Sequence, residues 1–322
     1  MTLDHSVVAR GRHCPLAYRY DPTDVSAAPE SSVADVLYVI GGLYGNPVAL
    51  ETIEAMAEVE RSEGRRVELI FNGDFHWFDT DPAIFWALND RVMRHTALLG
   101  NVEFELVDTH PGAGCGCVYP DHVDDGVVER SNRIMARLQG VAAECHEQVA
   151  ELRKLPRYRC LELAGQRVAI VHGDPESLAG WGLALEALRD HAHHATLQHW
   201  FERMGVSVIA GTHTCLPTLW HEGERAIINN GSAGMGNLRD DSRGLISRIA
   251  VDSSHPDALV RSRAGALTVE LLPVAFDIEA WQALFSRWWP DGSDAALSYG
   301  KRIRGGTRLD IEQAHLDLDT SR

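Results

Sequence analysis

The stretch VLYVIGGLYGN, from Val36 to Asn46, is typical of a buried strand that leads through a glycine-rich turn into a helix. Asn46 suits a helix N-cap and Pro47 a first turn, so the sequence predicts a helix over residues 46–64 that ends at Gly64. Turns at the carboxyl end of a strand often hold a ligand or a metal. This turn carries neither a carboxylate nor a histidine, so it lacks the side chains that usually bind a metal at such a place.

Strands and helices alternate after this stretch. We expect a strand over 66–71, a helix over 81–95, a glycine- and aspartate-rich insertion over 111–130, and one long helix over 131–155 that Ser131 or Asn132 opens. The pattern then changes to hairpins and single strands, expected over 160–174, 206–214, 218–232, 247–252 and 267–274. The fold class predicted is α/β, a four-layer αββα sandwich in which helices flank two mixed sheets packed face to face.

The chain is predicted to form one domain with two extensions. Residues 1–34 are rich in proline, serine and aspartate and form an N-terminal extension. Residues 35–275 form the sandwich. Residues 276–322 form a helical, basic C-terminal tail that packs on the same domain.

The composition argues against some classes of binding partner and indicates where the protein is located. The chain has 30 Lys and Arg against 46 Asp and Glu, a net charge of −16, which argues against nucleic acid and anionic membranes as partners. No apolar run is long enough for a membrane span, and the first residues lack a signal-peptide core, so a cytoplasmic location is expected. Six cysteines in 322 residues predict reduced thiols rather than a disulfide framework.

Polar residues collect where the expected strands end. The segments concerned are GGLYGN (41–46), FNGDFHWFD (71–79), LLGNVE (98–103), VAIVHGDP (168–175), IAGTHTCLP (209–217) and INNGS (228–232). Their order resembles that of the calcineurin-like metallophosphoesterase superfamily, whose loops carry GD-x-HGN, GD-x-x-D, GN, HG, GH-x-H and N-x-GS. The resemblance covers roughly residues 36–235 and implies the sandwich fold, a site for two metal ions and phosphoester hydrolysis.

The resemblance implies that one metal site is kept and the other is not. The second metal of the family would bind Asp74, Asn101, His172 and His213, and all four residue types are present. The first metal would need an aspartate, a histidine and a further histidine at positions 42, 44 and 215. This chain has Gly42, Tyr44 and Cys215 there, so only the bridging Asp74 remains. Taken singly, these residues also fit structural roles: Asp74 as a turn cap, Asn101 as a loop brace and the histidines as core residues.

Other residues could rebuild the lost half. Cys115, Cys117 and Cys215 could hold a soft metal with help from His76 or His110, although cysteine is also a common small core residue. Tyr44 either donates to a phosphoryl oxygen or fills the space of the missing ion. His76 is either a general acid, alongside Asp74, or a packed loop histidine.

The C-terminal segment SYGKRIRGG, 298–306, holds a basic cluster of Lys301, Arg302 and Arg304. Guanidinium groups bind phosphate well, so Arg302 and Arg304 are candidates for substrate binding; the alternative is a solvated surface.

The resemblance and the residues together predict a metal-dependent phosphoesterase that acts on a small phosphomonoester or phosphodiester. One divalent transition metal, Mn²⁺, Fe²⁺ or Zn²⁺, is expected, because two nitrogen and two oxygen ligands suit these ions; a second ion and the oligomeric state are left open. The alternative is a non-catalytic relative that binds a phosphorylated ligand or a partner protein.

Overall fold

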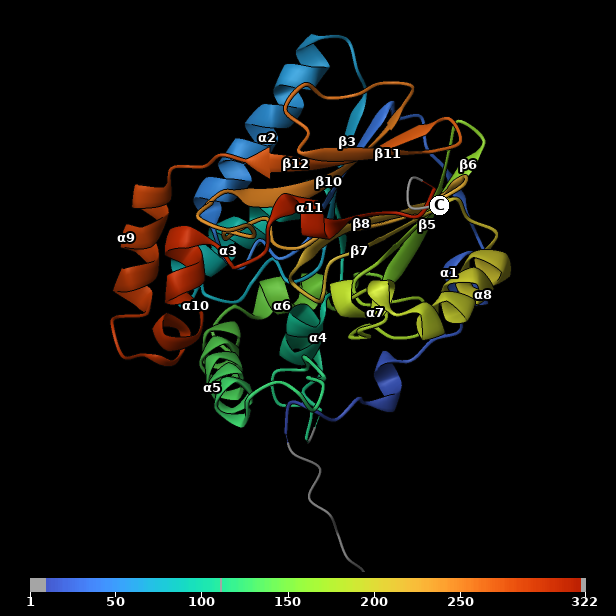
Figure 1. Ribbon diagram of the computed structural model, residues 1–322. Coiled ribbons are helices and arrows are strands. Elements are labelled where there is room, and N and C mark those ends of the chain that lie inside the picture. Colours follow the sequence, from blue (N-terminus) through green and yellow to red (C-terminus); the bar gives the residue numbers. More distant parts are fainter. Residues whose placement is uncertain (1–9, 111, 320–322) are drawn as a thin grey trace, which may run out of the picture.

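The computed structural model describes residues 10–110 and 112–319. The outermost parts of the predicted N-terminal extension and basic tail lie outside these residues. Two sheets pack face to face, and helices cover both outer faces (Figure 1). On one side lie α2 (Pro47–Ser62), α3 (Pro82–Val92) and α9 (Ile278–Trp288), and on the other lie α1 (Pro22–Val25), α7 (Leu185–Arg189) and α8 (His194–Met204). This is the predicted α/β sandwich of two mixed sheets flanked by helices.

The first sheet has the strand order β11-β12-β10-β2-β3-β4. Strands β2, β3 and β4 are parallel, while β10, β11 and β12 are antiparallel to their neighbours. Their bounds are β2 Val36–Ile40, β3 Val67–Asn72, β4 Thr96–Leu98, β10 Gly244–Val251, β11 Val260–Ala264 and β12 Leu267–Val274.

The second sheet has the strand order β1-β5-β6-β7-β9-β8-β13. It combines the predicted hairpins β5–β6 and β8–β9 with the parallel pairs β6–β7 and β7–β9. Its bounds are β1 Glu30–Ser31, β5 Tyr158–Leu163, β6 Gln166–Val171, β7 Val208–Gly211, β8 Pro217–Glu222, β9 Arg225–Asn230 and β13 His315–Asp317. The two-residue β1 and three-residue β13 were not predicted, because segments this short carry no periodic signal.

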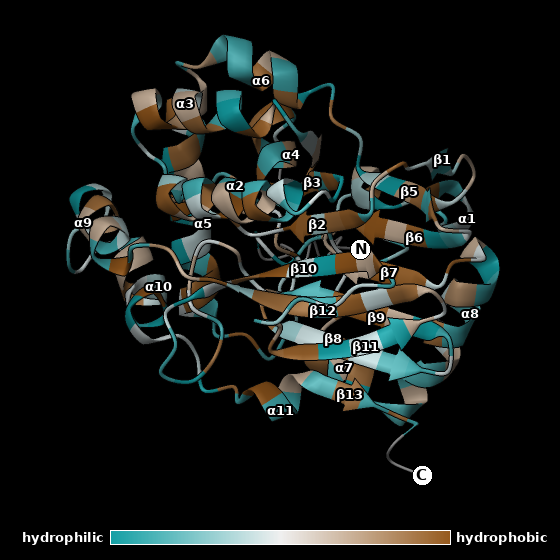
Figure 2. Cartoon of the chain, turned by 90° about the horizontal axis from the view of Figure 1, so that it is seen from above, coloured by the Kyte–Doolittle hydropathy of each residue, from teal (hydrophilic) through white to brown (hydrophobic). Residues whose placement is uncertain are grey.

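The core lies in three layers between these elements. Aliphatic residues of both sheets, such as Leu37, Ile170 and Ile249, form the cluster between the sheets. A second cluster joins the first sheet to its helices, and a third joins the second sheet to α8. All five residues of β2 are buried, as expected for a strand covered on both faces, and Figure 2 shows β2, β6 and β10 largely hydrophobic.

The helices on the first sheet begin where their caps predict. Asn46 accepts hydrogen bonds from the Val48 and Ala49 amides and opens α2, and Asp81 caps α3. The helix bounds are α1 Pro22–Val25, α2 Pro47–Ser62, α3 Pro82–Val92, α4 Asn101–Val107, α5 Asp125–Ala142, α6 His146–Leu152, α7 Leu185–Arg189, α8 His194–Met204, α9 Ile278–Trp288, α10 Asp294–Gly305 and α11 Ile311–Ala314.

The predicted long helix over 131–155 was wrong in both its start and its continuity. The helix α5 begins at Asp125, because Asp124 accepts a hydrogen bond from the Val127 amide and so acts as the cap. The backbone leaves the helix before Cys145, and α6 is a separate helix that packs against α3 and α4. Helical propensity along the sequence therefore does not reveal the break between α5 and α6.

The C-terminal segment adds to the sandwich rather than leaving it. Helix α10 packs against α5 and α9, and β13 pairs in parallel with β8 at the edge of the second sheet. Within residues 10–110 and 112–319, no helix has the length and apolar character needed to cross a membrane.

Candidate metal centre

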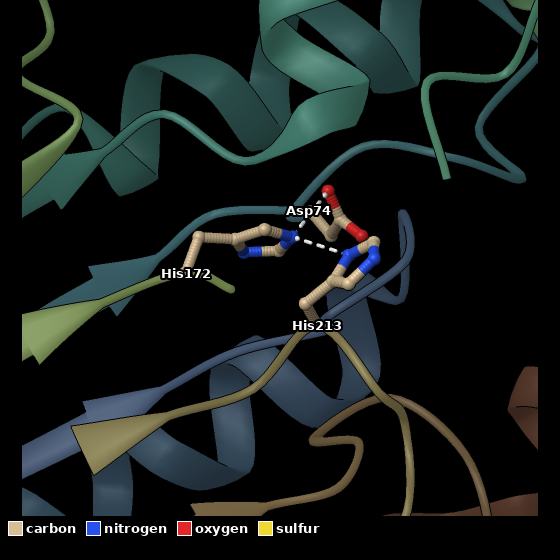
Figure 3. A group of neighbouring side chains, drawn as sticks. All are labelled: Asp74, His172 and His213. Atoms are coloured by element: carbon tan, nitrogen blue, oxygen red, sulfur yellow. Dashed lines mark hydrogen bonds and ion pairs between the residues drawn. The ribbon is translucent and has the colours of Figure 1, made fainter. Parts of the chain in front are cut away.

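Three buried side chains from separate loops meet at the ends of the central strands. Asp74 follows β3, His172 follows β6 and His213 follows β7. Figure 3 shows the two imidazole rings and the carboxylate pointing toward one another, and their ligand atoms all lie within 4.8 Å. Strand β3 belongs to the first sheet, while β6 and β7 belong to the second. The ends of these strands lie close together, and this brings Asp74, His172 and His213 to one place.

Asn101, at the first position of α4, completes the group. Its side-chain amide nitrogen donates to the Cys115 carbonyl, which turns the oxygen Oδ1 toward His172 at 3.1 Å from Nε2. The structure therefore brings all four predicted ligands of the kept site to one point.

The hydrogen bonds fix which atoms face this point. His172 Nδ1 donates to the Asn72 carbonyl at 2.8 Å, so in the neutral ring Nε2 carries a lone pair. His213 Nε2 donates to the Cys117 carbonyl at 3.0 Å, so its Nδ1, which lies 3.3 Å from His172 Nε2, carries another.

Four acceptor atoms therefore face one another: the two ring nitrogens, Asp74 Oδ1 at 3.4 Å from His172 Nε2, and Asn101 Oδ1. No hydrogen bond relieves this arrangement unless His172 takes up a proton. A divalent cation satisfies all four lone pairs at once, so the residues present fit a metal site.

The electrostatics agree with this donor set. Burial, aided by the neighbouring His172, lowers the pKa of His213 to about 3, so this ring is neutral. Burial opposes ionisation of both Asp74 and His172, but their mutual attraction wins: it holds the pKa of Asp74 below and that of His172 above the ordinary values. Without a cation, these shifts favour an ion pair between the Asp74 carboxylate and a protonated His172, which carries no net charge.

Glu103 braces the centre from behind and was not singled out from the sequence. Its carboxylate accepts the amides of Asp74 (2.7 Å), Gly100 (3.1 Å) and His76 (3.1 Å). Burial and the nearby Asp74 charge raise the pKa of Glu103 to about 7. A carboxylate two residues after the GN dipeptide was the only available signal, and it does not reveal that three backbone amides converge there.

Two glycines allow the loops to meet this closely. A Cβ at Gly73 would lie 2.4 Å from the backbone of Gly100, and one at Gly100 would lie 2.3 Å from Asp74 Oδ1. The GD and GN dipeptides of the sequence therefore mark positions where only glycine fits, next to each oxygen ligand.

The other half of the predicted two-metal site is filled by protein. The ring of Tyr44 lies against Gly42, where a Cβ would be 2.8 Å from Tyr44 Cε2. The Tyr44 hydroxyl shares a hydrogen bond of 2.8 Å with the Cys215 thiol. The three positions at which the family resemblance called for ligands thus form a packed cluster of glycine, tyrosine and cysteine.

The cysteines do not assemble into a separate metal site. Cys115 and Cys117 sit on one loop and Cys215 on another, and within the described residues no group of three mutually close metal ligands contains a cysteine. Cys117 and Cys215 do line the cavity beside Asp74. His110 packs edge-on against Tyr18, with its ring nitrogen 3.6 Å from Glu105, so it does not join them.

His76 lies away from the cavity. Its ring is fully buried, stacks on Phe85 at 3.8 Å, and places Nδ1 2.6 Å from Asp79 and Nε2 3.4 Å from the Asn89 oxygen. Burial opposes its charge, but Asp79 raises the pKa of His76 overall. This geometry matches the packed loop histidine and gives no support to the general acid.

The structure does not bring the two predicted arginines to the cavity. Arg302 donates to the carbonyls of Gly236 (2.7 Å) and Cys215 (2.6 Å) and to Asn237 Oδ1 (3.0 Å), so its guanidinium fastens α10 to two loops. Arg304 is exposed on the same helix. Neither residue is among those that line the cavity.

A cavity of about 190 Å³ opens directly onto the metal centre. Asp74, Asn101 and His213 form its polar floor, and its wall is largely aromatic. The remaining lining residues are Tyr44, Trp77, Val102, Cys117, Tyr119, Val127, Trp181, Thr214, Cys215, Ser298 and Tyr299.

Known structures share this fold. A metallophosphoesterase from Sphaerobacter thermophilus is 19% identical, with a TM-score of 0.50, over 85% of this chain and 100% of its own. A hypothetical protein from Pyrococcus horikoshii OT3 is 16% identical, with a TM-score of 0.56, over 85% of this chain and 99% of its own. No family model and no curated protein matches the chain. At these identities the likeness shows the fold alone, and it confirms the predicted metallophosphoesterase-like sandwich.

Proposed function

We propose that this protein is a metal-dependent phosphoester hydrolase that uses one divalent cation, held by Asp74, Asn101, His172 and His213. The observation that carries the proposal is the convergence of four potential ligand atoms in a buried site, where only a proton taken up by His172 would place a donor between them. Mn²⁺, Fe²⁺ and Zn²⁺ are the ions that this mixture of imidazole, carboxylate and amide oxygen favours.

The chain's own residues would hold the metal ligands in position and enclose the substrate. Asn72 and Cys117 hold the two imidazoles through their carbonyls, and the Val102 amide holds Asp74 Oδ1 at 3.1 Å. Such outer contacts fix ligand orientation in metal sites. The aromatic side chains that line the cavity would reduce its contact with water, which would strengthen electrostatic interactions inside it. A cation bound there would supply Lewis-acid polarisation of a phosphoryl oxygen.

Metal analysis combined with turnover tests this proposal. Purified protein given Mn²⁺ or Zn²⁺ is expected to retain one ion per chain and to hydrolyse aryl phosphate mono- or diesters. His172→Ala should lose both the ion and the turnover. His199→Ala, which removes an exposed histidine on α8, is the matched control and should keep both. Retention of the ion by His172→Ala would contradict the assignment.

A second candidate is a non-catalytic protein that binds a metal and a phosphorylated ligand. The packed Tyr44–Cys215 pair favours it, because it occupies the place where the family resemblance implied a second ion. One bound ion with tight phosphate-ester binding and no turnover, across mono- and diesters, would support this candidate over the first. The predicted cytoplasmic location, and a phosphoester rather than a protein as partner, remain part of the proposal.

A further inference from the structure

Aromatic side chains make up a large part of the cavity lining, and the polar ends of three of them are hydrogen-bonded to the protein. Trp181 Nε1 donates to the Cys117 carbonyl at 3.0 Å, the Tyr119 hydroxyl bonds Ser131 at 3.0 Å, and the Tyr44 hydroxyl bonds Cys215. The polar ends of these three side chains are therefore already engaged with the protein. An entering ligand meets their carbon faces, which favours an apolar or aromatic group.

The cavity also lacks a positive side chain. Among the residues that line it, none is a lysine or an arginine. Two guanidinium groups lie behind the lining residues: Arg302 donates to Cys215, Gly236 and Asn237, and Arg130 donates to the Ser298 hydroxyl at 2.7 Å. A divalent cation carries two positive charges, of which the Asp74 carboxylate offsets one and the Glu103 carboxylate behind it, mostly ionised at pH 8, offsets the other.

From these two features, and resting on the proposed function, we propose that the site selects a singly charged phosphodiester with one small aromatic arm over a doubly charged phosphomonoester. Because Asp74 and Glu103 already offset the charge of the cation, a second negative charge on the ligand has no counter-charge among the lining residues and adds to the cost of binding. The volume of about 190 Å³ lies below the usual range for ligand pockets, so there is room for the phosphoryl group and about one ring.

Hydrolysis of such a diester consumes one water. The water oxygen forms a bond to phosphorus, the bond from phosphorus to the oxygen of the aromatic arm breaks, and one proton of the water ends on the released hydroxyl group. The remaining product is a phosphomonoester, which loses its second proton to solvent near neutral pH. Its second negative charge then weakens its hold on the site, so the same charge balance that admits the substrate favours release of the product.

Three probes separate ring and charge in a titration calorimetry experiment on the metal-loaded protein at pH 8. O-methyl phenylphosphonate carries a ring and one charge, phenylphosphonate carries a ring and two charges, and dimethyl phosphate carries one charge and no ring. We expect the first probe to bind at least about tenfold more tightly than either of the others. Equal or tighter binding of phenylphosphonate, or of dimethyl phosphate, would overturn the inference.

Variants of the wall test the two features separately. Trp181→Leu should weaken binding of O-methyl phenylphosphonate about tenfold and leave dimethyl phosphate unchanged, while Trp86→Leu, at a tryptophan that is 52% exposed on α3, should change neither. Val127→Lys places a cation at the wall and should shift the preference toward phenylphosphonate by about tenfold. If Val127→Lys leaves the preference unchanged, the charge argument is overturned.

The outcomes distinguish this inference from the proposed function. A wild-type protein that binds no divalent metal overturns both. A wild-type protein that binds one ion through His172 and His213 but prefers the doubly charged probe overturns only the inference about substrate class, and the metal-dependent hydrolase stands.

Discussion

At the scale of single residues, the centre is defined by what each side chain faces. His172 Nε2 and His213 Nδ1 can offer a lone pair to a cation only because each neutral ring donates its other nitrogen's proton to a backbone carbonyl. The same residue types, rotated by half a turn, would present a proton instead of a lone pair. The chemistry of the site therefore depends on Asn72 and Cys117 as hydrogen-bond acceptors as much as on the two rings.

The raised pKa of His172 predicts how metal affinity depends on pH. In the protein without a cation, burial opposes the charge of His172, but the interaction with Asp74 raises its pKa above the ordinary 6.5. Below that raised pKa a cation must displace one proton, so affinity should fall about tenfold for each pH unit as the pH drops. Competition with a coloured chelator from pH 8 to pH 6 measures this. A flat profile would show that His172 binds no cation.

Gly42 and Tyr44 are predicted to be coupled. Gly42→Ala forces a Cβ to 2.8 Å from the Tyr44 ring at a φ of +62°, so it should lower the free energy of unfolding by about 2–4 kcal/mol. In a Tyr44→Ala background the collision is gone, and only the backbone strain of about 1–2 kcal/mol should remain. A double-mutant cycle by chemical denaturation measures the difference, and strict additivity would contradict the packing described here.

At the scale of elements, a buried ion network joins α2 to the first sheet. Arg248 on β10 donates to Glu60 of α2 at 2.8 Å through two nitrogens and to Glu270 of β12 at 2.7 Å, and the Tyr38 hydroxyl of β2 donates to Glu60 at 2.7 Å. All four residues are nearly or fully buried. The network fixes the position of α2, and so of the turn at Gly42–Asn46 that precedes it.

Removing one partner of this network should be costly. Glu60→Ala leaves the Arg248 charge buried with one carboxylate fewer, so we expect a loss of about 3–5 kcal/mol in the free energy of unfolding. Glu58→Ala, on the exposed face of the same helix, should change it by less than about 0.5 kcal/mol. Urea denaturation of both variants measures these losses. A loss for Glu60→Ala as small as that for Glu58→Ala would show that the network adds no stability.

At the scale of the whole molecule, the C-terminal segment holds the site loops in place. Arg302 on α10 reaches the Cys215 and Gly236 carbonyls, and Trp289 Nε1 donates to the Phe78 carbonyl at 2.9 Å. Arg302 lies 87 positions after Cys215 in the sequence and yet holds the loop that carries His213. The tail is structurally part of the site even though its arginines do not line the cavity.

Two variants of α10 separate fastening from substrate binding. Arg302→Ala should lower the free energy of unfolding by about 2 kcal/mol and weaken metal binding, because three hydrogen bonds to the loops are lost. Arg304→Ala changes an exposed residue two positions further along α10, and it should affect neither the free energy of unfolding nor metal binding. If Arg304→Ala instead weakens binding of a phosphoester probe with stability unchanged, substrate binding by Arg304 is supported.

The predictable part of the fold came from local patterns. Buried strands such as 36–40, capped helices such as 47–62 and the hairpins at Gly165 and Gly223 each carry their signal within a dozen residues. The start of α5 at Asp125 and its end before Cys145 were not predicted. The insertion before the helix contains Asp121, Asp124 and Asp125, and the sequence alone does not show which of them caps the helix. The strand β13 escaped because only pairing with β8 makes three residues into a strand.

The sequence by itself determined the sandwich and the meeting of Asp74, Asn101, His172 and His213. The order of the strand ends and their glycine neighbours can be read along the chain, and the resemblance to the metallophosphoesterase superfamily implied that these ends, which belong to two facing sheets, meet at one point. Only the tertiary structure decided that Tyr44 and Cys215 fill the other half of the site, that His76 is enclosed by Phe85 and Asn89, and that Arg302 fastens loops. Each of these outcomes depends on which distant side chain packs against the residue, and no spacing along the chain encodes that neighbour.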